Sequence, residues 1–421
     1  MTILSIVEAV VTPVAFPDPP LLNSAGAHQP WALRTIVELR TGDGLIGLGE
    51  TYGDAPHLAL VRRAADALVG VDAFDLAAVR RAVSLAIGYA DISDRHGLIG
   101  PSSATRTLLK VLSPFEVAAI DLQARAVGRP VCDVLGGRIR ERVPFSAYLF
   151  YKWAGHPGAE PDEWGAALDP DGLVAQADAM IKKYGFRSIK LKGGVLPPDD
   201  EVDAMLALRE AFPEHPLRLD PNCAWSVATS RRVAERTSGI LEYLEDPTPG
   251  IPGMAEVAAS AQMPLATNMC VVEFADIPEA FARGAVGVVL ADHHYWGGLR
   301  ACADLARICH TWGVGVSMHS NSHLGISLAA MTHLGSTLSN LTYAADTHTP
   351  WQGCVDVVTA PLSIVDGEVT VPDGPGLGVE LDRDALARLH ENYVRCGIRE
   401  RDDTAYMRTV HPNFVKRRPR W

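Results

Sequence analysis

The 421-residue chain lacks several features that would place it in other classes of protein. It has no apolar run of membrane-spanning length and no signal-peptide pattern, so we expect a soluble, cytoplasmic protein. Its seven cysteines are odd in number and show no CxxC spacing, which favours reduced thiols over disulfides. Basic residues are in deficit, with 38 Lys and Arg against 50 Asp and Glu, and the resulting formal charge of -12 argues against nucleic acid as a partner.

The hydrophobic content of 48% is enough for a substantial core, and the length predicts two or three domains. Residues 2–50 are typical of strands, and helical patterns follow at about 56–69, 74–90 and 114–127. Between the first strands, residues 17–30 are too rich in Pro, Gly and Asn for regular structure, and we expect a mobile loop there. These elements predict an α+β capping domain over residues 1–142.

Short apolar runs recur along residues 143–360, and each one ends in a polar residue. Counting from Lys192, the polar ends fall at positions 220, 245, 268, 292, 319 and 346, at intervals of 23 to 28 residues. Each interval is the length of one strand, one helix and two turns. An upstream run at 145–151 places Tyr148 in an equivalent position.

Eight such units predict an α/β fold, a (β/α)8 barrel whose active site lies at the carboxyl ends of the strands. An open doubly wound sheet would give similar alternation, but the glycine-rich phosphate fingerprint after its first strand is absent. We expect residues 361–421 to add two short strands and a helix and to return to the capping domain. The loop at 153–171 is expected to cover the barrel mouth.

The run RSIKLKGG reads as a strand that directs Lys190 and Lys192 to one face. A lone Lys-x-Lys is more often a solvated edge, but two ammonium groups inside a barrel require an anion between them. Asp220, Glu245 and Asn268 end three consecutive strands, and two carboxylates with an amide oxygen suit Mg²⁺. For any one of these three residues alone, a helix-capping role is the better interpretation.

Asp292 and His319 end the sixth and seventh strands, opposite the lysines. A carboxylate that holds one imidazole nitrogen raises the basicity of the other, so His319 is a candidate general acid and base. A histidine on an interior strand is otherwise usually structural, and that role is expected for five others: His293, His294, His310, His323 and His333.

The ordered motifs KLK, LDPN, LEDP, ATNM, LADHHYWGG and MHSNSHLGIS resemble the enolase superfamily, and within it the glucarate dehydratase family. AIDLQARAVGRPVCDVLGG and GPGLGVELD extend the resemblance over nearly the whole chain. The resemblance implies a Lys or His base acting with Mg²⁺ on a carbon next to a carboxylate. It also implies a small dicarboxylate sugar acid as the partner, and a homo-oligomer.

The resemblance further implies roles for individual residues. Lys192 would take the α-proton, and Lys190 beside it would hold charge and tune the pKa of Lys192. His319 with Asp292 would be the base on the opposite side and the acid that assists hydroxide departure. Asp220, Glu245 and Asn268 would bind Mg²⁺, with Asn222 and Asn321 in support. Substrate-binding positions would be Asn23, His28, Ser102, Tyr148, Ser320, His348 and Arg401.

Ser102 stands where the family has threonine, Cys223 stands where glycine is expected, and the loop at 153–171 has no match. The first hypothesis is a D-glucarate dehydratase that also accepts L-idarate, since bases face both sides of the carbon. The second is another acid-sugar dehydratase, such as one for galactarate, or an epimerase. The third is a weakly active partner subunit, which the filled catalytic positions disfavour.

Overall fold

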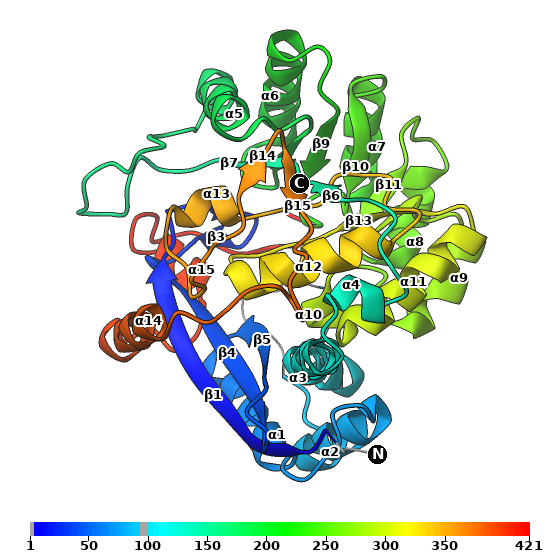
Figure 1. Cartoon of the computed structure of the whole chain (residues 1–421). Helices are drawn as coiled ribbons and strands as arrows, with labels where there is room; N and C mark the ends of the chain where they lie inside the picture. Colours follow the sequence, from blue (N-terminus) through cyan, green and yellow to red (C-terminus); the bar gives the residue numbers. More distant parts are fainter. Residues whose placement is uncertain (1–3, 93–99) are drawn as a thin grey trace.

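The computed structural model describes residues 4–92 and 100–421, and its largest element is a parallel sheet curled into a barrel (Figure 1). Seven strands lie side by side in sequence order: β7 (Ala147–Phe150), β8 (Ile189–Lys192), β9 (Leu217–Asp220), β10 (Leu241–Glu245), β11 (Leu265–Thr267), β12 (Val288–Ala291) and β13 (Gly315–Met318). They are almost entirely buried, as strands covered by helices on one face and packed into a core on the other must be.

Helices connect these strands and form an outer ring around them (Figure 1). They are α5 (Pro170–Tyr184), α6 (Pro198–Ala211), α7 (Val227–Arg236), α8 (Gly250–Ala258), the 3₁₀ turn η1 (Phe274–Asp276), α9 (Ile277–Ala282), α10 (His293–Trp296), α11 (Leu299–Thr311) and α12 (Gly325–Thr337). The predicted barrel is therefore confirmed, with each strand followed by a helix on the outside.

The eighth barrel position is less regular than predicted. Leu341 and Ala345 form single parallel bridges to Val316 and Phe145, and so close the barrel between β13 and β7. The amides of residues 342 and 343 both approach the same Val316 carbonyl, at 3.2 and 3.4 Å, so the ladder is interrupted there. The expected strand is thus an irregular segment, followed by the single-turn helix α13 (Thr349–Gln352).

The N-terminal part is an antiparallel sheet in the order β1 (Ile6–Pro17), β4 (Trp31–Thr41), β5 (Ile46–Tyr52), covered by α1 (Ala55–Asp66), α2 (Leu76–Ile87) and α3 (Ala104–Ala126). The prediction that the third helix starts at 114 was wrong. Ser103 caps α3, because its hydroxyl accepts the Arg106 amide at 3.1 Å, and Pro114 lies inside the helix. The helix packs closely on β5, whose Gly49 would place a Cβ 2.0 Å from the Pro114 carbonyl oxygen. Burial against the sheet therefore outweighs the hydrogen bond that proline removes.

Residues 17–30 differ from the prediction that they lack regular structure. They contain a small hairpin of β2 (Leu22–Asn23) and β3 (Gly26–Ala27), and its residues are buried. The cover comes from α15 (Asp403–Met407), near the other end of the chain. Gly26 has φ +141°, and a Cβ there would lie 2.2 Å from the Asp403 carbonyl oxygen, so only glycine fits.

The C-terminal segment reaches both parts of the molecule. β14 (Ile364–Val365) pairs with β15 (Glu368–Thr370), which pairs with β6 (Arg142–Pro144) just after α4 (Val131–Val134). Helix α14 (Arg383–Arg395) lies along β1, and Arg383 donates to both Glu38 oxygens at 2.7 Å (Figure 1). The boundaries at 142/143 and 360/361 stay a prediction.

The last residues of the chain contact the barrel and the N-terminal hairpin. The backbone of residues 420–421 donates to the Ala224 carbonyl in the loop after β9, at 2.6 and 3.1 Å. The Arg418 guanidinium donates to the Ser24 hydroxyl at 2.9 Å. The tail therefore connects the β2–β3 hairpin to the barrel mouth.

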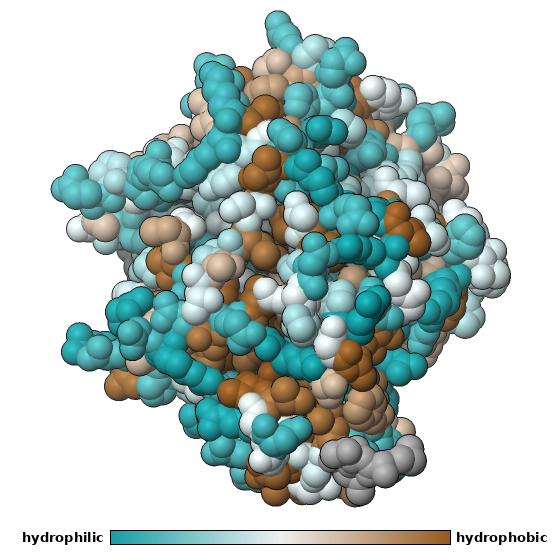
Figure 2. Space-filling model, in the orientation of Figure 1, coloured by the Kyte–Doolittle hydropathy of each residue, from teal (hydrophilic) through white to brown (hydrophobic). Residues whose placement is uncertain are grey.

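The molecular surface is mostly polar over the barrel helices, and apolar atoms gather over the lower, N-terminal part in the same orientation (Figure 2). All seven cysteines lie within the described residues and are unpaired thiols, as predicted. Among the helices of the described ranges, none combines the length and the apolar character needed to cross a membrane.

Candidate active site

A small pocket opens at the carboxyl ends of the barrel strands, beneath the β2–β3 hairpin. Its lining is Asn23, His28, Tyr148, Phe150, Lys192, His319, Ser320, Asn321, His348 and Arg401. All of these except Phe150 were predicted from the sequence. The structure thus brings together residues from the N-terminal hairpin, the barrel and the C-terminal segment.

Lys190 and Lys192 project from β8 into a group of carboxylates. The Lys190 ammonium lies 2.7 Å from Asp346, 2.6 Å from Glu245 and 3.7 Å from Asp220, and all four side chains are fully buried. Burial alone would lower the pKa of Lys190, but Asp346 and Glu245 outweigh it and raise that pKa well above the ordinary value. Lys190 is therefore a fixed cation, and Asp346 is a site residue that we did not select from the sequence.

Lys192 reaches the pocket, and its ammonium donates to Asp220 Oδ2 at 2.6 Å. Burial works against the charge on Asp220, but Lys192 and Lys190 outweigh it and lower the pKa of Asp220. The Tyr148 hydroxyl lies 3.5 Å from the same Asp220 oxygen, and its ring faces Lys190 at 4.7 Å. Tyr148 therefore packs against the ammonium groups as a cation–π partner.

The oxygens of Asp220, Glu245 and Asn268 fit a divalent cation. Both Glu245 oxygens, Asn268 Oδ1 and Asn222 Oδ1 are buried without a hydrogen-bond donor in the described part of the chain, although Glu245 Oε2 pairs with Lys190. Burial and the Asp220 charge raise the pKa of Glu245 well above its ordinary value. A bound cation would reverse that effect and supply the missing partners, and an all-oxygen set suits Mg²⁺.

Neighbouring residues hold these oxygen donors in place. Asp246, next to Glu245, accepts the Thr267 hydroxyl at 2.5 Å and the Asn268 amide at 2.8 Å. Asn222 donates to Asp220 Oδ1 from its backbone at 3.0 Å and from its side chain at 3.1 Å. Cys223 has φ +59°, a left-handed conformation that explains why glycine was expected at this position.

His319 and Asp292 form the predicted dyad. The His319 Nδ1–H donates to Asp292 Oδ2 at 2.8 Å, which leaves Nε2 as the reactive nitrogen, and His319 lines the pocket. Burial works against the Asp292 charge, but His294 and His319 outweigh it and lower its pKa well below the ordinary value. His294 was expected to be purely structural, yet its Nδ1 lies 2.8 Å from Asp292 Oδ1.

Arg401 enters the pocket from the C-terminal segment and is held by Asp403. Arg401 donates to the two Asp403 oxygens at 2.8 and 2.7 Å, to Asn321 Oδ1 at 3.0 Å and to His28 Nε2 at 2.8 Å. Asn23 donates to the same Asp403 at 2.8 Å. Asp403 thus bonds Arg401 and Asn23 directly, and through Arg401 it is linked to Asn321 and His28. The sequence signal for this role was its position in RERDD, two residues after Arg401.

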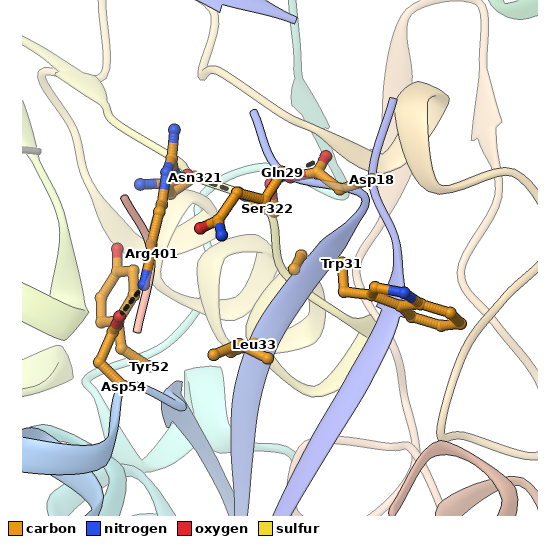
Figure 3. A pocket seen from close by; sticks show the side chains of 10 residues that line it. Asp18, Gln29, Trp31, Leu33, Tyr52, Asp54, Asn321, Ser322 and Arg401 are labelled. Carbon is orange, nitrogen blue, oxygen red and sulfur yellow. Dashed lines mark hydrogen bonds between the residues drawn. The ribbon is translucent and has the colours of Figure 1, made fainter. Parts of the chain in front are cut away.

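A second pocket lies on the other side of Arg401, between the barrel mouth and the N-terminal sheet. Figure 3 shows Arg401 and Asn321 on one side of it and Trp31 on the far side. The Arg401 amide donates to Asp54 Oδ1 at 2.7 Å, and Ser322 lies 3.4 Å from Asp18 Oδ2. These contacts fix the C-terminal segment against the entrance of the capping domain.

The remaining predicted residues are placed as follows. The Ser320 hydroxyl lies 3.1 Å from His348 Nδ1, so these two residues meet in the pocket. The loop at 153–171 contacts the mouth through His156, which bonds Tyr406 at 2.8 Å and the Asp18 carbonyl at 2.7 Å. Ser102 is exposed and is not among the residues that line the pocket, and its contact with substrate stays a prediction. Its segment lies near the Asn268 loop, because a Cβ on Gly100 would fall 2.3 Å from the Met269 carbonyl oxygen.

A capped barrel with charged strand ends around a small polar pocket defines a class of barrel enzymes. The family model "Enolase C-terminal domain-like" matches residues 172–385. A Streptomyces coelicolor protein named "Probable glucarate dehydratase" is 54% identical to this chain, covering 99% of each. The chain belongs to the enolase superfamily.

Solved structures agree with that assignment. A Thermobispora bispora enolase complexed with magnesium and formate is 61% identical and superposes with a TM-score of 0.98, covering 99% of this chain and 100% of that one. A Pseudomonas fluorescens enolase with bound magnesium, potassium and tartrate is 49% identical, with a TM-score of 0.96 and full coverage of both chains.

Proposed function

We propose that the protein is a Mg²⁺-dependent aldarate dehydratase that converts D-glucarate into 5-dehydro-4-deoxy-D-glucarate and water, and that it also accepts L-idarate. The observation that carries the proposal is that Lys192 and His319 line one pocket together with Arg401. Two groups able to move protons and one fixed cation suit a hydroxy diacid. The relative named for glucarate dehydration and the neighbour holding tartrate, itself a hydroxy diacid, support this class of substrate.

Lys192 is the proposed base for the α-proton of D-glucarate. Its ammonium bonds Asp220 in the free protein, and it must give up a proton before it can accept one from the substrate. Lys190 lies beside it, held at 2.7 Å from Asp346, and so keeps a second ammonium group next to the proposed base. Lys190 also stabilises the negative charge that develops on the substrate carboxylate.

His319 is the proposed acid for the departing hydroxyl. Because its Nδ1–H is committed to Asp292, a proton on Nε2 is the one it can deliver into the pocket. The same nitrogen, when neutral, would take the α-proton of the opposite epimer, L-idarate. Two groups in one pocket would thus serve two epimers.

Asp220, Glu245 and Asn268 are the proposed holders of Mg²⁺, which when bound would supply Lewis-acid stabilisation of substrate oxygens. Arg401 is the proposed partner of the distal carboxylate, and Asp403 holds its guanidinium in place through the Nε and Nη2 donors at 2.8 and 2.7 Å. The hydroxyl groups would be contacted by Asn23, His28, Tyr148, Ser320 and His348. Asn222 and Asn321 would support the site. Assembly into a homo-oligomer stays a prediction.

Turnover of a panel of aldarates tests the proposal. Purified protein with Mg²⁺ is expected to dehydrate D-glucarate and L-idarate, with the keto product followed by NMR. Dehydration of galactarate but not D-glucarate would assign a different acid-sugar dehydratase, and epimerisation without loss of water would assign an epimerase. Binding of the diacids without any turnover would indicate a binding subunit rather than an active dehydratase.

A further inference from the structure

Asp292 holds two imidazoles rather than one. Its Oδ2 lies 2.8 Å from His319 Nδ1, and its Oδ1 lies 2.8 Å from His294 Nδ1 and 2.9 Å from the His294 amide. All three side chains are buried. Because both rings draw on one carboxylate, the protonation state of His294 decides how much of the Asp292 charge remains for His319.

The hydrogen bonds of His294 define its tautomer. An ionised carboxylate only accepts, so His294 Nδ1 must carry a proton. At the other side of the ring, Nε2 lies 2.7 Å from an Arg34 nitrogen, and a guanidinium only donates. Nε2 is therefore unprotonated, and His294 is neutral. Ser327 Oγ, 2.8 Å from Nε2, accepts from Arg34 at 3.3 Å and does not require a proton on the ring.

Arg34 comes from β4 of the N-terminal sheet and is itself tightly held. Its Nε donates to Glu50 Oε1 at 2.8 Å, and its guanidinium carbon lies 4.5 Å from the centre of the Tyr52 ring. Glu50 in turn accepts the Leu324 and Ser327 amides, each at 2.9 Å, at the start of α12. The capping domain thus places a fixed cation against a ring that shares its carboxylate with the candidate acid and base.

We propose that Arg34 and His294 are positioning residues for His319. By donating to His294 Nε2, Arg34 keeps His294 as a neutral Nδ1–H donor, so the Asp292 charge is not cancelled by a second imidazolium. The proposal deepens the proposed function, because it assigns the capping domain a part in setting the pH range in which His319 works. Burial and then Arg34 lower the pKa of His294, which agrees with this geometry.

Other charged or titratable groups surround His294, and they define what the test must control. They are His293 and Tyr295 on the same short helix, Tyr52 and Glu50 on β5, His57 on α1, Lys110 on α3, and His323 and His319 after β13. Among these groups Glu50 is the carboxylate, and it is paired with Arg34, so a variant of Arg34 also changes the surroundings of Glu50.

NMR of ¹⁵N-labelled histidine in the substrate-free protein tests the proposal without relying on any reaction. His294 is expected to carry one proton, on Nδ1, and to show no titration step between about pH 5 and 8. In Arg34→Met the step should appear, because Nε2 becomes free to take a proton. Arg40→Met is the matched control, since Arg40 lies on the same strand and pairs with Glu8 and Glu38 instead. A protonated Nε2 in the unmodified protein, or a His294 that stays neutral in Arg34→Met, would overturn the proposal.

Arg34→Met leaves the buried Glu50 carboxylate without its ionic partner, which destabilises the fold. A second variant is therefore needed in which this charge is also removed. The double variant Arg34→Met/Glu50→Gln removes both charges and should show the same His294 step. His294→Leu and His294→Gln give a second, independent route. Leu removes the donor to Asp292, whereas Gln can restore it without adding charge.

The pH profile of deuterium exchange at the α-carbon of L-idarate is the readout for these two variants. His294→Leu should displace the profile and change the rate at its acidic end by about tenfold, and His294→Gln should restore it. An unchanged profile in His294→Leu would show that His294 only fills space. If the unmodified protein fails to exchange L-idarate at all, the proposed acceptance of L-idarate fails, while the NMR titration still decides the proposal about Arg34.

Discussion

On the β8–β10 side of the mouth, charged groups of the barrel hold one another, whereas on the β12–β13 side the contacts of the barrel residues continue to residues outside the barrel. Lys190, Lys192 and Glu245 are fixed by contacts within the barrel, through Asp346 and Asp220. By contrast, His319 bonds Asp292, which also bonds His294, and His294 contacts Arg34 of the capping domain. Asn321 accepts from Arg401 of the C-terminal segment. One side should therefore survive changes in the cap, while the other should respond to them.

The largest expected effect lies on the barrel side. Glu245→Gln removes a proposed metal-binding carboxylate, and we expect kcat/KM to fall by about a thousandfold or more. We expect a similar loss when the unmodified enzyme is treated with excess EDTA. The thermal midpoint without metal should not fall, because burial already raises the pKa of Glu245 and a neutral amide avoids that cost. Glu256→Gln, which affects only an exposed pair with Arg231, is the control. Full turnover in excess EDTA would show that the reaction does not depend on a metal ion.

The next effect lies at the junction with the C-terminal segment. Arg401→Lys loses the fork that Asp403 orients, so we expect KM to rise by about a hundredfold with a smaller change in kcat. Arg399→Lys is the control, because Arg399 donates only to backbone carbonyls, including that of Tyr393 at 2.8 Å. Steady-state kinetics with D-glucarate measures both variants. If Arg401→Lys has the same KM as the unmodified enzyme, the proposal that Arg401 binds the substrate is contradicted.

The contact between cap and barrel should also respond to pH. Glu116 of α3 accepts the Leu299 and Arg300 amides at 2.8 and 3.0 Å, and burial raises its pKa to about 7 from an ordinary 4.5. The folded state therefore binds this proton more tightly, so the stabilisation is present below about pH 4.5 and is lost as pH rises through about 7.

Urea unfolding at about pH 5 and pH 8 measures this difference. Glu116→Gln cannot ionise, so relative to the unmodified protein it should gain stability as pH rises, by about 2 to 4 kcal/mol if the full shift is realised. An identical pH dependence in both proteins would show that Glu116 is ionised in the folded state at neutral pH.

The smallest expected effect is that of Ser102→Ala. Ser102 is exposed and outside the pocket, so kcat/KM for D-glucarate should change by less than about twofold. A much larger loss would show that Ser102 contacts the substrate, as the family resemblance implied.

Sequence spacing predicted the barrel because each repeat ends in a residue that the strand itself delivers to the mouth. Lys192, Asp220, Glu245 and His319 were found that way, and so was the Asp346 position, although its pairing with Lys190 was not. The partners of these residues could not be found locally. Arg34 meets His294 across 260 residues, and Asn23 meets Asp403 across 380. Such contacts depend on how the capping domain packs against the barrel, and the regular spacing of strands and helices in the sequence does not predict that packing.

The same reason explains the wrong predictions for 17–30 and for the start of α3. The Pro, Gly and Asn content of residues 17–30 argued against any regular structure in this hairpin. Composition could not show that α15 covers it, or that β5 accepts Pro114 inside a helix. Local sequence signals predicted an element correctly where its packing partners lie nearby in the chain. They failed where a distant segment supplies those partners.

Deuterium exchange at the α-carbon of both epimers, followed by NMR in D₂O, tests the division of labour most directly. His319→Asn should abolish dehydration but still exchange the α-proton of D-glucarate, because Lys192 and the metal ligands remain. Lys192→Met should lose that exchange while the His319–Asp292 dyad still exchanges the α-proton of L-idarate. Exchange of D-glucarate at the unmodified rate in Lys192→Met would contradict the assignment of Lys192 as its base.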